Sequence, residues 1–219
     1  MQKIQLLILV FAFISCNSNK SKNPKNEPQV AALTTAEIPQ TNGYEVGDLA
    51  TDFNLKNVDG KMVSLKNYKD AKGFIIAFTC NHCPFSKAYE DRIIALDKKY
   101  QSEGFPVIAI NPTDPEKYAS DSYENMQKRA EEKDYTFPYL LDVGQKIFPL
   151  YGATNTPHMY VLNKTAAGNK VAYIGAIDDN AKDASAVQKR YVEDAVDALL
   201  AGEAPKVTKT KAIGCTISQ

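Results

Sequence analysis

The order of hydrophobic and polar positions predicts alternating strands and helices from Tyr44 onward. The stretch GFIIAFT places five apolar residues after Gly73, which is typical of a buried strand. The next segment, from about Pro84 to Gln101, carries an apolar stripe at spacings of three and four and predicts a helix with one buried face. The stripe consists of Tyr89, Ile93, Leu96 and Tyr100.

The alternation continues through the second half of the chain. We expect a second buried strand at FPVIAIN, a polar helix at SYENMQKRAEEKDY, and a helical turn that follows FPYLLD and runs to Tyr151. A hairpin is predicted for HMYVLN and KVAYIGAI, because a glycine-containing connection at Thr165 to Asn169 joins them. A final helix is predicted from about Ala184 to Ala201.

These elements together define a fold class. Two early strand–helix–strand crossovers imply parallel strands covered by helices, and the late hairpin adds antiparallel strands. The predicted fold is therefore α/β, with a mixed central β-sheet flanked by helices on both faces. The sequence contains no glycine-rich phosphate loop or nucleotide-binding fingerprint.

The N-terminus predicts export. Lys3 is followed by an apolar run from Leu6 to Ile14, which is too short to span a bilayer as a stable helix, so residues 1–15 are interpreted as a signal peptide. Cys16 follows directly and, with a small residue before it, resembles the lipobox of bacterial lipoproteins, although Phe13 replaces the usual leucine. The alternative is an ordinary signal peptide with an accidental cysteine.

The lipobox resemblance implies a lipid on Cys16 that holds the protein on the membrane. Residues 17–29 contain no apolar side chain and two prolines, so we expect residues 16–43 to form a flexible tether and residues 44–219 to fold. The expected location is the bacterial cell envelope, on the periplasmic side.

The charge balance and the histidine content bear on which partners and metals the protein can bind. The 26 basic residues of the 219-residue chain balance the 26 acidic ones, so nothing in the net charge indicates a nucleic-acid partner. The only two histidines are His82 and His158, which limits the sets of metal ligands and catalytic bases available.

The sequence TCNHCP brings two cysteines to the point where an apolar strand ends and a helix begins. Free backbone N–H groups and the helix dipole at such a turn favour a thiolate. We therefore interpret Cys80 as an exposed, attacking sulfur and Cys83 as the resolving one, with Pro84 in the first turn of the helix. A protonated His82 would stabilise the thiolate and tune the potential of the pair. Structural zinc is the alternative, but a second ligand pair is missing from the sequence.

The strand, CNHC and helix, with TNTPHMYVL about seventy residues later, resemble the thioredoxin-like superfamily. The resemblance implies Cys80 as nucleophile, Cys83 as resolving cysteine, and Thr156–Pro157 as a cis-proline pair that binds the substrate backbone. No cofactor is implied, because the cysteines themselves carry the electrons. The histidine before the second cysteine is similar to the oxidising members of the superfamily.

The opening VGDLATDFNLKNVDGKMVSLKNYKD is similar to the redoxin (AhpC/TSA) branch, which includes peroxiredoxins and membrane-bound thioredoxins. The tail, residues 203–219, ends in TKTKAIGCTISQ and resembles that of a peroxiredoxin-like subgroup. Peroxidatic cysteines have a threonine three positions before them and a proline seven before; neither Cys80 nor Cys83 does. Two residues also depart from thioredoxin, because Thr79 replaces its tryptophan and Phe74 its buried aspartate.

Two residues leave alternatives open. Cys215 is either a third redox thiol, able to pair with Cys80, Cys83 or another protein, or a small hydrophobic residue of the tail. His158 follows the proline and faces the sulfurs or points away from them. If it faces them, two thiolates and an imidazole would suit copper delivery.

We therefore expect a membrane-tethered, extracytoplasmic thiol–disulfide oxidoreductase. Its partners would be protein or small-molecule thiols and disulfides, a redox protein that recycles it, and the membrane through Cys16, but no nucleic acid. A peroxiredoxin-like thiol peroxidase and a copper-delivering protein of the same fold are the alternatives.

Overall fold

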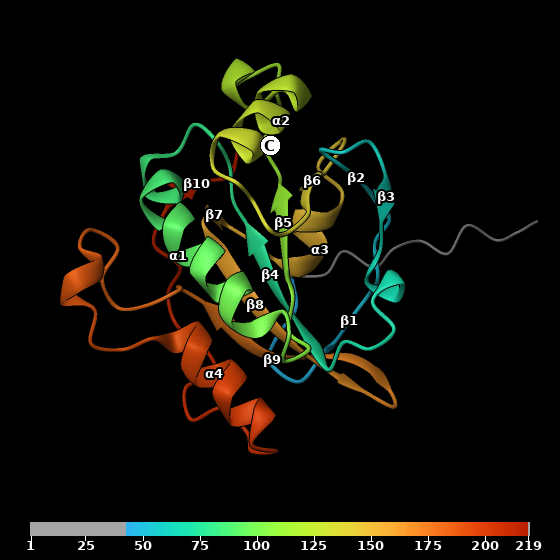
Figure 1. Cartoon of the computed structure of the whole chain (residues 1–219), viewed down its shortest axis with the longest axis vertical. Helices are drawn as coiled ribbons and strands as arrows, with labels where there is room; N and C mark the ends of the chain where they lie inside the picture. Colours follow the sequence, from blue (N-terminus) through green and yellow to red (C-terminus); the bar gives the residue numbers. More distant parts are fainter. Residues whose placement is uncertain (1–42, 219) are drawn as a thin grey trace, which may run out of the picture. The chain divides into compact units, whose positions relative to one another are not determined.

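The computed structural model describes residues 43–218 (Figure 1). Residues 1–42, which include the predicted signal peptide, Cys16 and nearly all of the predicted tether, lie outside the described part of the chain. Within residues 43–218, no helix is both long and apolar enough to cross a membrane.

The strands in chain order are β1 (Leu49–Ala50), β2 (Leu55–Asn57), β3 (Met62–Val63), β4 (Gly73–Phe78), β5 (Val107–Asn111), β6 (Tyr139–Leu141), β7 (Asn155–Thr156), β8 (His158–Thr165), β9 (Gly168–Gly175) and β10 (Cys215–Thr216). The α-helices are α1 (Pro84–Tyr100), α2 (Tyr123–Glu132), α3 (Ile147–Tyr151) and α4 (Tyr191–Leu200). Short 3-10 helices are η1 (Leu65–Asn67), η2 (Ala119–Asp121) and η3 (Ala184–Ala186).

Eight strands form one mixed sheet in the order β1-β9-β8-β4-β5-β6-β2-β3, and β10 pairs separately with β7. The pairs β4–β5 and β5–β6 are parallel, and each is connected through a helix, α1 or α2, as the two predicted crossovers require. The predicted hairpin is also confirmed, because β8 and β9 pair antiparallel and β8 adds antiparallel to β4.

The central strand β4 explains why the sequence is apolar on both sides of the sheet. All six of its residues are buried, and they alternate between two apolar clusters. Ile75 and Ala77 pack toward α1, α2 and α4, whereas Ile76 and Phe78 pack toward α3 and η1. Helices therefore cover both faces, as predicted for a strand buried on each side. In Figure 1, α1 lies across the sheet.

The final helix begins later than predicted. A helix was expected from about Ala184, but η3 ends at Ala186 and α4 starts only at Tyr191. The backbone N–H of Gln188 donates to the Asp179 carboxylate, and the Lys189 carbonyl accepts from the Asp179 N–H. These bonds to a distant loop hold residues 188–189 outside the helix.

Candidate functional site: a cysteine turn clasped by the tail

The turn after β4 carries the chemistry that the sequence indicates. Cys80 follows β4 by two residues, Cys83 is the N-cap residue of α1, and Pro84 is its first residue. The strand-to-helix placement is therefore as predicted. It brings Cys83 to the positive end of the dipole of a 17-residue helix.

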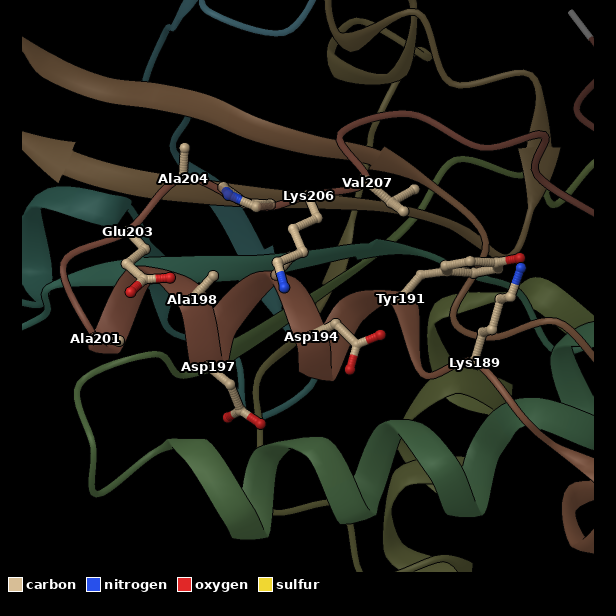
Figure 2. A pocket seen from close by; sticks show the side chains of 12 residues that line it. Lys189, Tyr191, Asp194, Asp197, Ala198, Ala201, Glu203, Ala204, Lys206 and Val207 are labelled. Atoms are coloured by element: carbon tan, nitrogen blue, oxygen red, sulfur yellow. The ribbon is translucent and has the colours of Figure 1, made fainter.

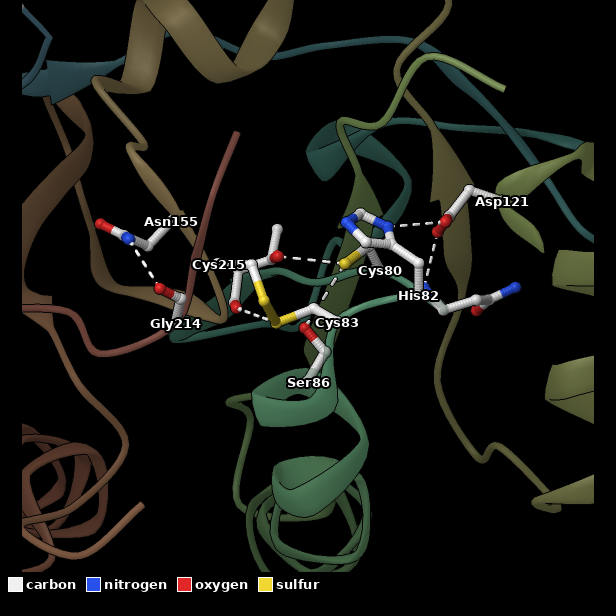
Figure 3. The surroundings of a disulfide bond; sticks show 10 residues. Cys80, His82, Cys83, Ser86, Asp121, Asn155, Gly214 and Cys215 are labelled. Atoms are coloured by element: carbon white, nitrogen blue, oxygen red, sulfur yellow. Dashed lines mark hydrogen bonds and ion pairs between the residues drawn. A yellow bond between two sulfur atoms is a disulfide. The ribbon is translucent and has the colours of Figure 1, made fainter. Parts of the chain in front are cut away.

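The disulfide in this structure joins Cys83 to Cys215, across 132 residues, with the Cα atoms 5.9 Å apart (Figure 3). Cys80 is a free thiol. The sequence favoured a Cys80–Cys83 pair as the redox unit and left the partner of Cys215 open. The tail decides the pairing here, because β10 runs antiparallel to β7 and places Cys215 opposite Thr156, beside Cys83.

The Cys80 thiol is buried rather than exposed as expected. Its residue is only 3% exposed, the Thr156 hydroxyl oxygen lies 3.0 Å from its sulfur, and the Ser86 hydroxyl lies 3.6 Å away. Burial raises the pKa of Cys80 above its usual value, and this outweighs the lowering by the two hydroxyl groups. The expected low-pKa, outward-facing sulfur is therefore wrong for this disulfide-bonded state.

His82 is held beside this thiol by a buried carboxylate. Its Nδ1 lies 2.8 Å from Asp121 Oδ2, and its ring stacks on Tyr118 with centroids 4.0 Å apart. The Cys80 sulfur, a His82 ring nitrogen and an Asp121 oxygen all lie within 4.8 Å of one another. Figure 3 shows His82 and Asp121 on one side of Cys80 and the disulfide on the other.

Asp121 is the site residue that the sequence analysis missed. It lies 39 positions beyond His82, directly before the segment predicted as a polar helix, and it is fully buried. Its Oδ1 accepts hydrogen bonds from the Asn81 backbone N–H at 2.6 Å and from Asn111 Nδ2 at 2.9 Å. The Tyr139 hydroxyl donates to Asn81 Oδ1 at 3.0 Å. No periodicity marks these residues, because only the folded sheet brings them together.

The Thr156–Pro157 peptide bond is cis, as the resemblance implied. Thr156 contacts Cys80 through its hydroxyl and Cys215 through strand pairing, so this loop does face the cysteines. Its proposed role in binding a substrate backbone stays a prediction.

His158 takes no part in the cysteine site. It is 7% exposed, its ring lies beside Tyr160, and its Nδ1 accepts a hydrogen bond from the Thr154 backbone N–H. Burial lowers the pKa of His158 to about 4, so it is neutral near pH 7. Among residues 43–218, the group able to offer three metal ligands is instead Cys80, His82 and Asp121. A metal there would have to displace the hydrogen bond between His82 and Asp121.

Little open space is left between the cysteine site and the tail. A pocket of about 10 Å³ lies between His82 and Tyr118 on one side and Thr216, Ile217 and Ser218 on the other. A larger pocket of about 610 Å³ lies between α4 and the segment from Glu203 to Val207 (Figure 2). No cysteine or histidine lines the larger pocket, so it is separate from the cysteine chemistry.

A mixed sheet with a cysteine turn at the start of α1, faced by a cis-proline loop, defines the thioredoxin-like class of folds. The AhpC/TSA family model matches residues 46–174. The chain therefore belongs to the AhpC/TSA family, the redoxin branch that its opening sequence resembles.

Individual relatives agree with this assignment. The chain is 26% identical over 129 residues to thiol-disulfide oxidoreductase ResA of Geobacillus thermodenitrificans, covering 58% of this chain and 68% of that protein. It is 30% identical over 122 residues to thioredoxin-like protein YneN of Bacillus subtilis, covering 56% and 68%. The chain spans about two thirds of the length of these relatives, and 62% of the length of the ResA from Halalkalibacterium halodurans.

A solved structure matches more of the chain. An uncharacterized conserved protein from Geobacillus kaustophilus superposes with a TM-score of 0.74 at 37% identity, covering 80% of this chain and 92% of that one. The fold and the named relatives together support the oxidoreductase class expected from the sequence.

Proposed function

We propose that this protein is a membrane-tethered thiol–disulfide oxidoreductase of the cell envelope, in which Cys80 attacks and Cys83 is the central sulfur. One observation carries the proposal. A free thiol, Cys80, lies in the same turn as a disulfide sulfur, Cys83, and beside the His82–Asp121 pair. The relatives named thiol-disulfide oxidoreductase support the same chemistry.

The chemical step is an internal thiol–disulfide exchange. The Cys80 thiolate attacks Cys83 Sγ, a Cys80–Cys83 bond forms, the Cys83–Cys215 bond breaks, and Cys215 leaves as a thiolate that takes up a proton. One thiol and one disulfide are present before and after, so no external electron is needed. The Cys80–Cys83 disulfide then passes to a substrate dithiol, or a partner dithiol reduces it.

The His82–Asp121 pair can remove the proton from Cys80, although burial disfavours the thiolate. Because the pKa of Cys80 is raised, a nearby base is needed to take its proton at neutral pH. With Nδ1 donating to Asp121, the nitrogen left to accept that proton is Nε2. Asp121 fixes this tautomer and stabilises the imidazolium that results.

Neither alternative function matches the site as well. The residues that activate peroxide in peroxiredoxins are missing around both cysteines, and Cys80 is buried with a raised pKa. Copper delivery would need the His158 ring beside the cysteine sulfurs. That ring packs against Tyr160 and is not part of the Cys80, His82 and Asp121 group.

Cys80→Ser tests the proposal. In a turnover assay with insulin or oxidised glutathione, we expect Cys80→Ser to abolish exchange, because no attacking thiol remains beside Cys83. Cys16→Ser is the matched control, since it removes a cysteine outside the described domain and should leave turnover of purified protein unchanged. Wild-type turnover in Cys80→Ser would overturn the exchange mechanism.

The same control variant tests the tether. We propose that Cys16 carries the lipid, because it directly follows the predicted signal peptide. In cells fed a radiolabelled fatty acid, the wild-type protein should take up label and partition with membranes. If Cys16→Ser still does both, the lipoprotein assignment is wrong.

A further inference from the structure

The tail is bound to the domain at more than one point, and this arrangement bears on the substrate. The Thr208 carbonyl accepts a hydrogen bond from the Ile174 N–H, and the Thr210 N–H donates to the Ile174 carbonyl, so the tail first adds to the end of β9. At Gly175 the backbones approach so closely that a Cβ would lie 2.6 Å from the Thr210 carbonyl oxygen. The tail then crosses to the cysteine turn.

There the tail occupies the edge of β7 as an extended strand. Besides the Cys215–Thr156 pairing, the Ile217 N–H donates to the Thr154 carbonyl at 3.0 Å, and Asn155 Nδ2 donates to the Gly214 carbonyl at 3.0 Å. Gln145 Nε2 holds the Ser218 carbonyl at 2.8 Å. An extended peptide that adds to a strand edge through main-chain hydrogen bonds is a common mode of peptide recognition.

We propose that residues 212–218 act as a built-in substitute for the substrate, docked on β7 and held covalently by Cys215 until exchange at Cys83 releases them. The inference rests on the proposed exchange function. It identifies the substrate as an extended, cysteine-bearing segment of another protein, which replaces the tail on the same edge.

Gly214 gives this surface a sequence preference. A Cβ at this position would lie 2.2 Å from the Thr156 carbonyl oxygen and 3.0 Å from the Pro157 nitrogen, and neither backbone atom can move easily. The residue before a docked cysteine must therefore be glycine. We expect substrates with a Gly-Cys sequence to react faster than substrates with a larger residue before the cysteine.

The proposal also bears on the access of solvent to the attacking thiol. Cys80 is 3% exposed while the disulfide holds the tail in place. Once Cys215 is a free thiol, only the hydrogen bonds of the tail compete with an incoming peptide. Exchange thus opens the peptide site at the moment when the Cys80–Cys83 disulfide becomes available.

The test uses the full chain with Cys215→Ser, reduced beforehand so that Cys80 and Cys83 are thiols that can attack a capped peptide. In this variant the tail can dock but cannot bond covalently. Adding Gly214→Val should undock the tail and raise the exchange rate with a glutathione-capped AIGCTIS peptide by about tenfold, which is about 1.4 kcal/mol of competing tail binding. The matched control is Val207→Ala, since Val207 lies in the tail but outside residues 212–218, is 43% exposed, and its loss should leave the rate unchanged.

A second probe checks the sequence preference on the same proteins. A capped AIVCTIS peptide should react no faster than oxidised glutathione, because its valine meets the Thr156 carbonyl. Equal rates with and without Gly214→Val, or equal rates for the two peptides, would overturn the tail proposal while exchange survives. Absence of exchange with oxidised glutathione in every variant would instead refute the proposed function.

Discussion

Opposing influences act on the thiol of Cys80. Burial and the nearby Asp121 carboxylate raise its pKa, whereas the hydroxyl groups of Thr156 and Ser86 lower it. The His82–Asp121 pair offers a route for its proton. The reactivity of the thiol therefore depends on groups that lie far from it in sequence. Asp121 allows this dependence to be tested, because it contacts His82 without contacting the sulfur of Cys83.

Replacing Asp121 by asparagine should slow the reaction of Cys80. The variant keeps the shape of the side chain but loses the charge that stabilises protonated His82, so we expect alkylation of Cys80 by iodoacetamide to fall by about tenfold at pH 7. Because the Asp121 charge also raises the pKa of Cys80, the pH profile of the variant should move to lower pH even as its rate falls, a combination that a purely structural role of Asp121 would not cause.

The control for this variant is Asp70→Asn, at an exposed position before the start of β4 and so at the opposite end of that strand from the cysteine turn, which should alter neither rate nor profile. An Asp121→Asn profile identical to that of the wild type would show that the carboxylate does not act through His82. Mass spectrometry of the alkylated protein assigns the label to Cys80 rather than to another cysteine.

His158 makes stability depend on pH. Its folded-state pKa of about 4 lies below the ordinary value of 6.5, so the unfolded chain binds this proton more tightly. The contribution of neutral His158 to the free energy of unfolding is therefore fully present above pH 6.5. It is lost as the pH falls toward 4, a decrease of about 3 kcal/mol in total. A protonated ring could no longer accept the Thr154 hydrogen bond.

His158→Asn should remove this part of the acid sensitivity. Asparagine offers a carbonyl oxygen to the Thr154 N–H but does not titrate, so urea unfolding midpoints should change less between pH 7 and pH 4 than in the wild type. Parallel pH curves for the two proteins would mean that His158 does not carry the proton uptake.

At the scale of elements, α1 and α2 are joined by an ion pair that the helical pattern alone did not predict. Glu90 is not part of the apolar stripe of α1, yet it is only 5% exposed. Arg129 donates to both of its carboxylate oxygens, and the Tyr135 hydroxyl donates at 3.0 Å. A buried carboxylate that loses its partner is costly, because the desolvated charge remains.

Lys133 Nζ lies 3.6 Å from the same carboxylate, so the charge of Glu90 stays partly paired and Arg129→Met should lower the free energy of unfolding by at most about 3 kcal/mol. Adding Glu90→Gln should recover part of the loss, since no unpaired charge is then buried. Lys128→Met on the same helix is the control. Its side chain is 71% exposed and pairs only with Glu132 at 3.8 Å, so about 0.5 kcal/mol or less is expected. A double variant as unstable as the single one would contradict this account.

The elements themselves follow from local patterns more completely than their connections do. The apolar run of β4 and the stripe of α1 are explicit in the sequence, and both elements lie where predicted. The start of α4 was predicted too early, because the bonds from Asp179 to residues 188–189 come from a loop that no local pattern identifies. The pairing of β10 with β7 likewise depends on residues about sixty positions apart.

At the scale of the whole molecule, sequence reasoning reached the fold and the reactive turn but not the full site. Cys80, His82 and Cys83 are contiguous, so a motif can identify them. Asp121 and Cys215 join them only through the packing of η2 and the path of the tail. Burial reversed the expected direction of the Cys80 pKa, and burial depends on the complete tertiary structure.

The Cys83–Cys215 bond also has a consequence for how the protein is made. Cys83 leaves the ribosome 132 residues ahead of Cys215, a delay of roughly 10 s at ordinary rates of synthesis, and Cys80 leaves slightly earlier. Among the cysteines of the described domain, Cys80 and Cys83 are therefore the first pair that an oxidising disulfide of the envelope can join. The mature bond would then arise by running the proposed exchange in reverse, so that biosynthesis and turnover would share one reaction.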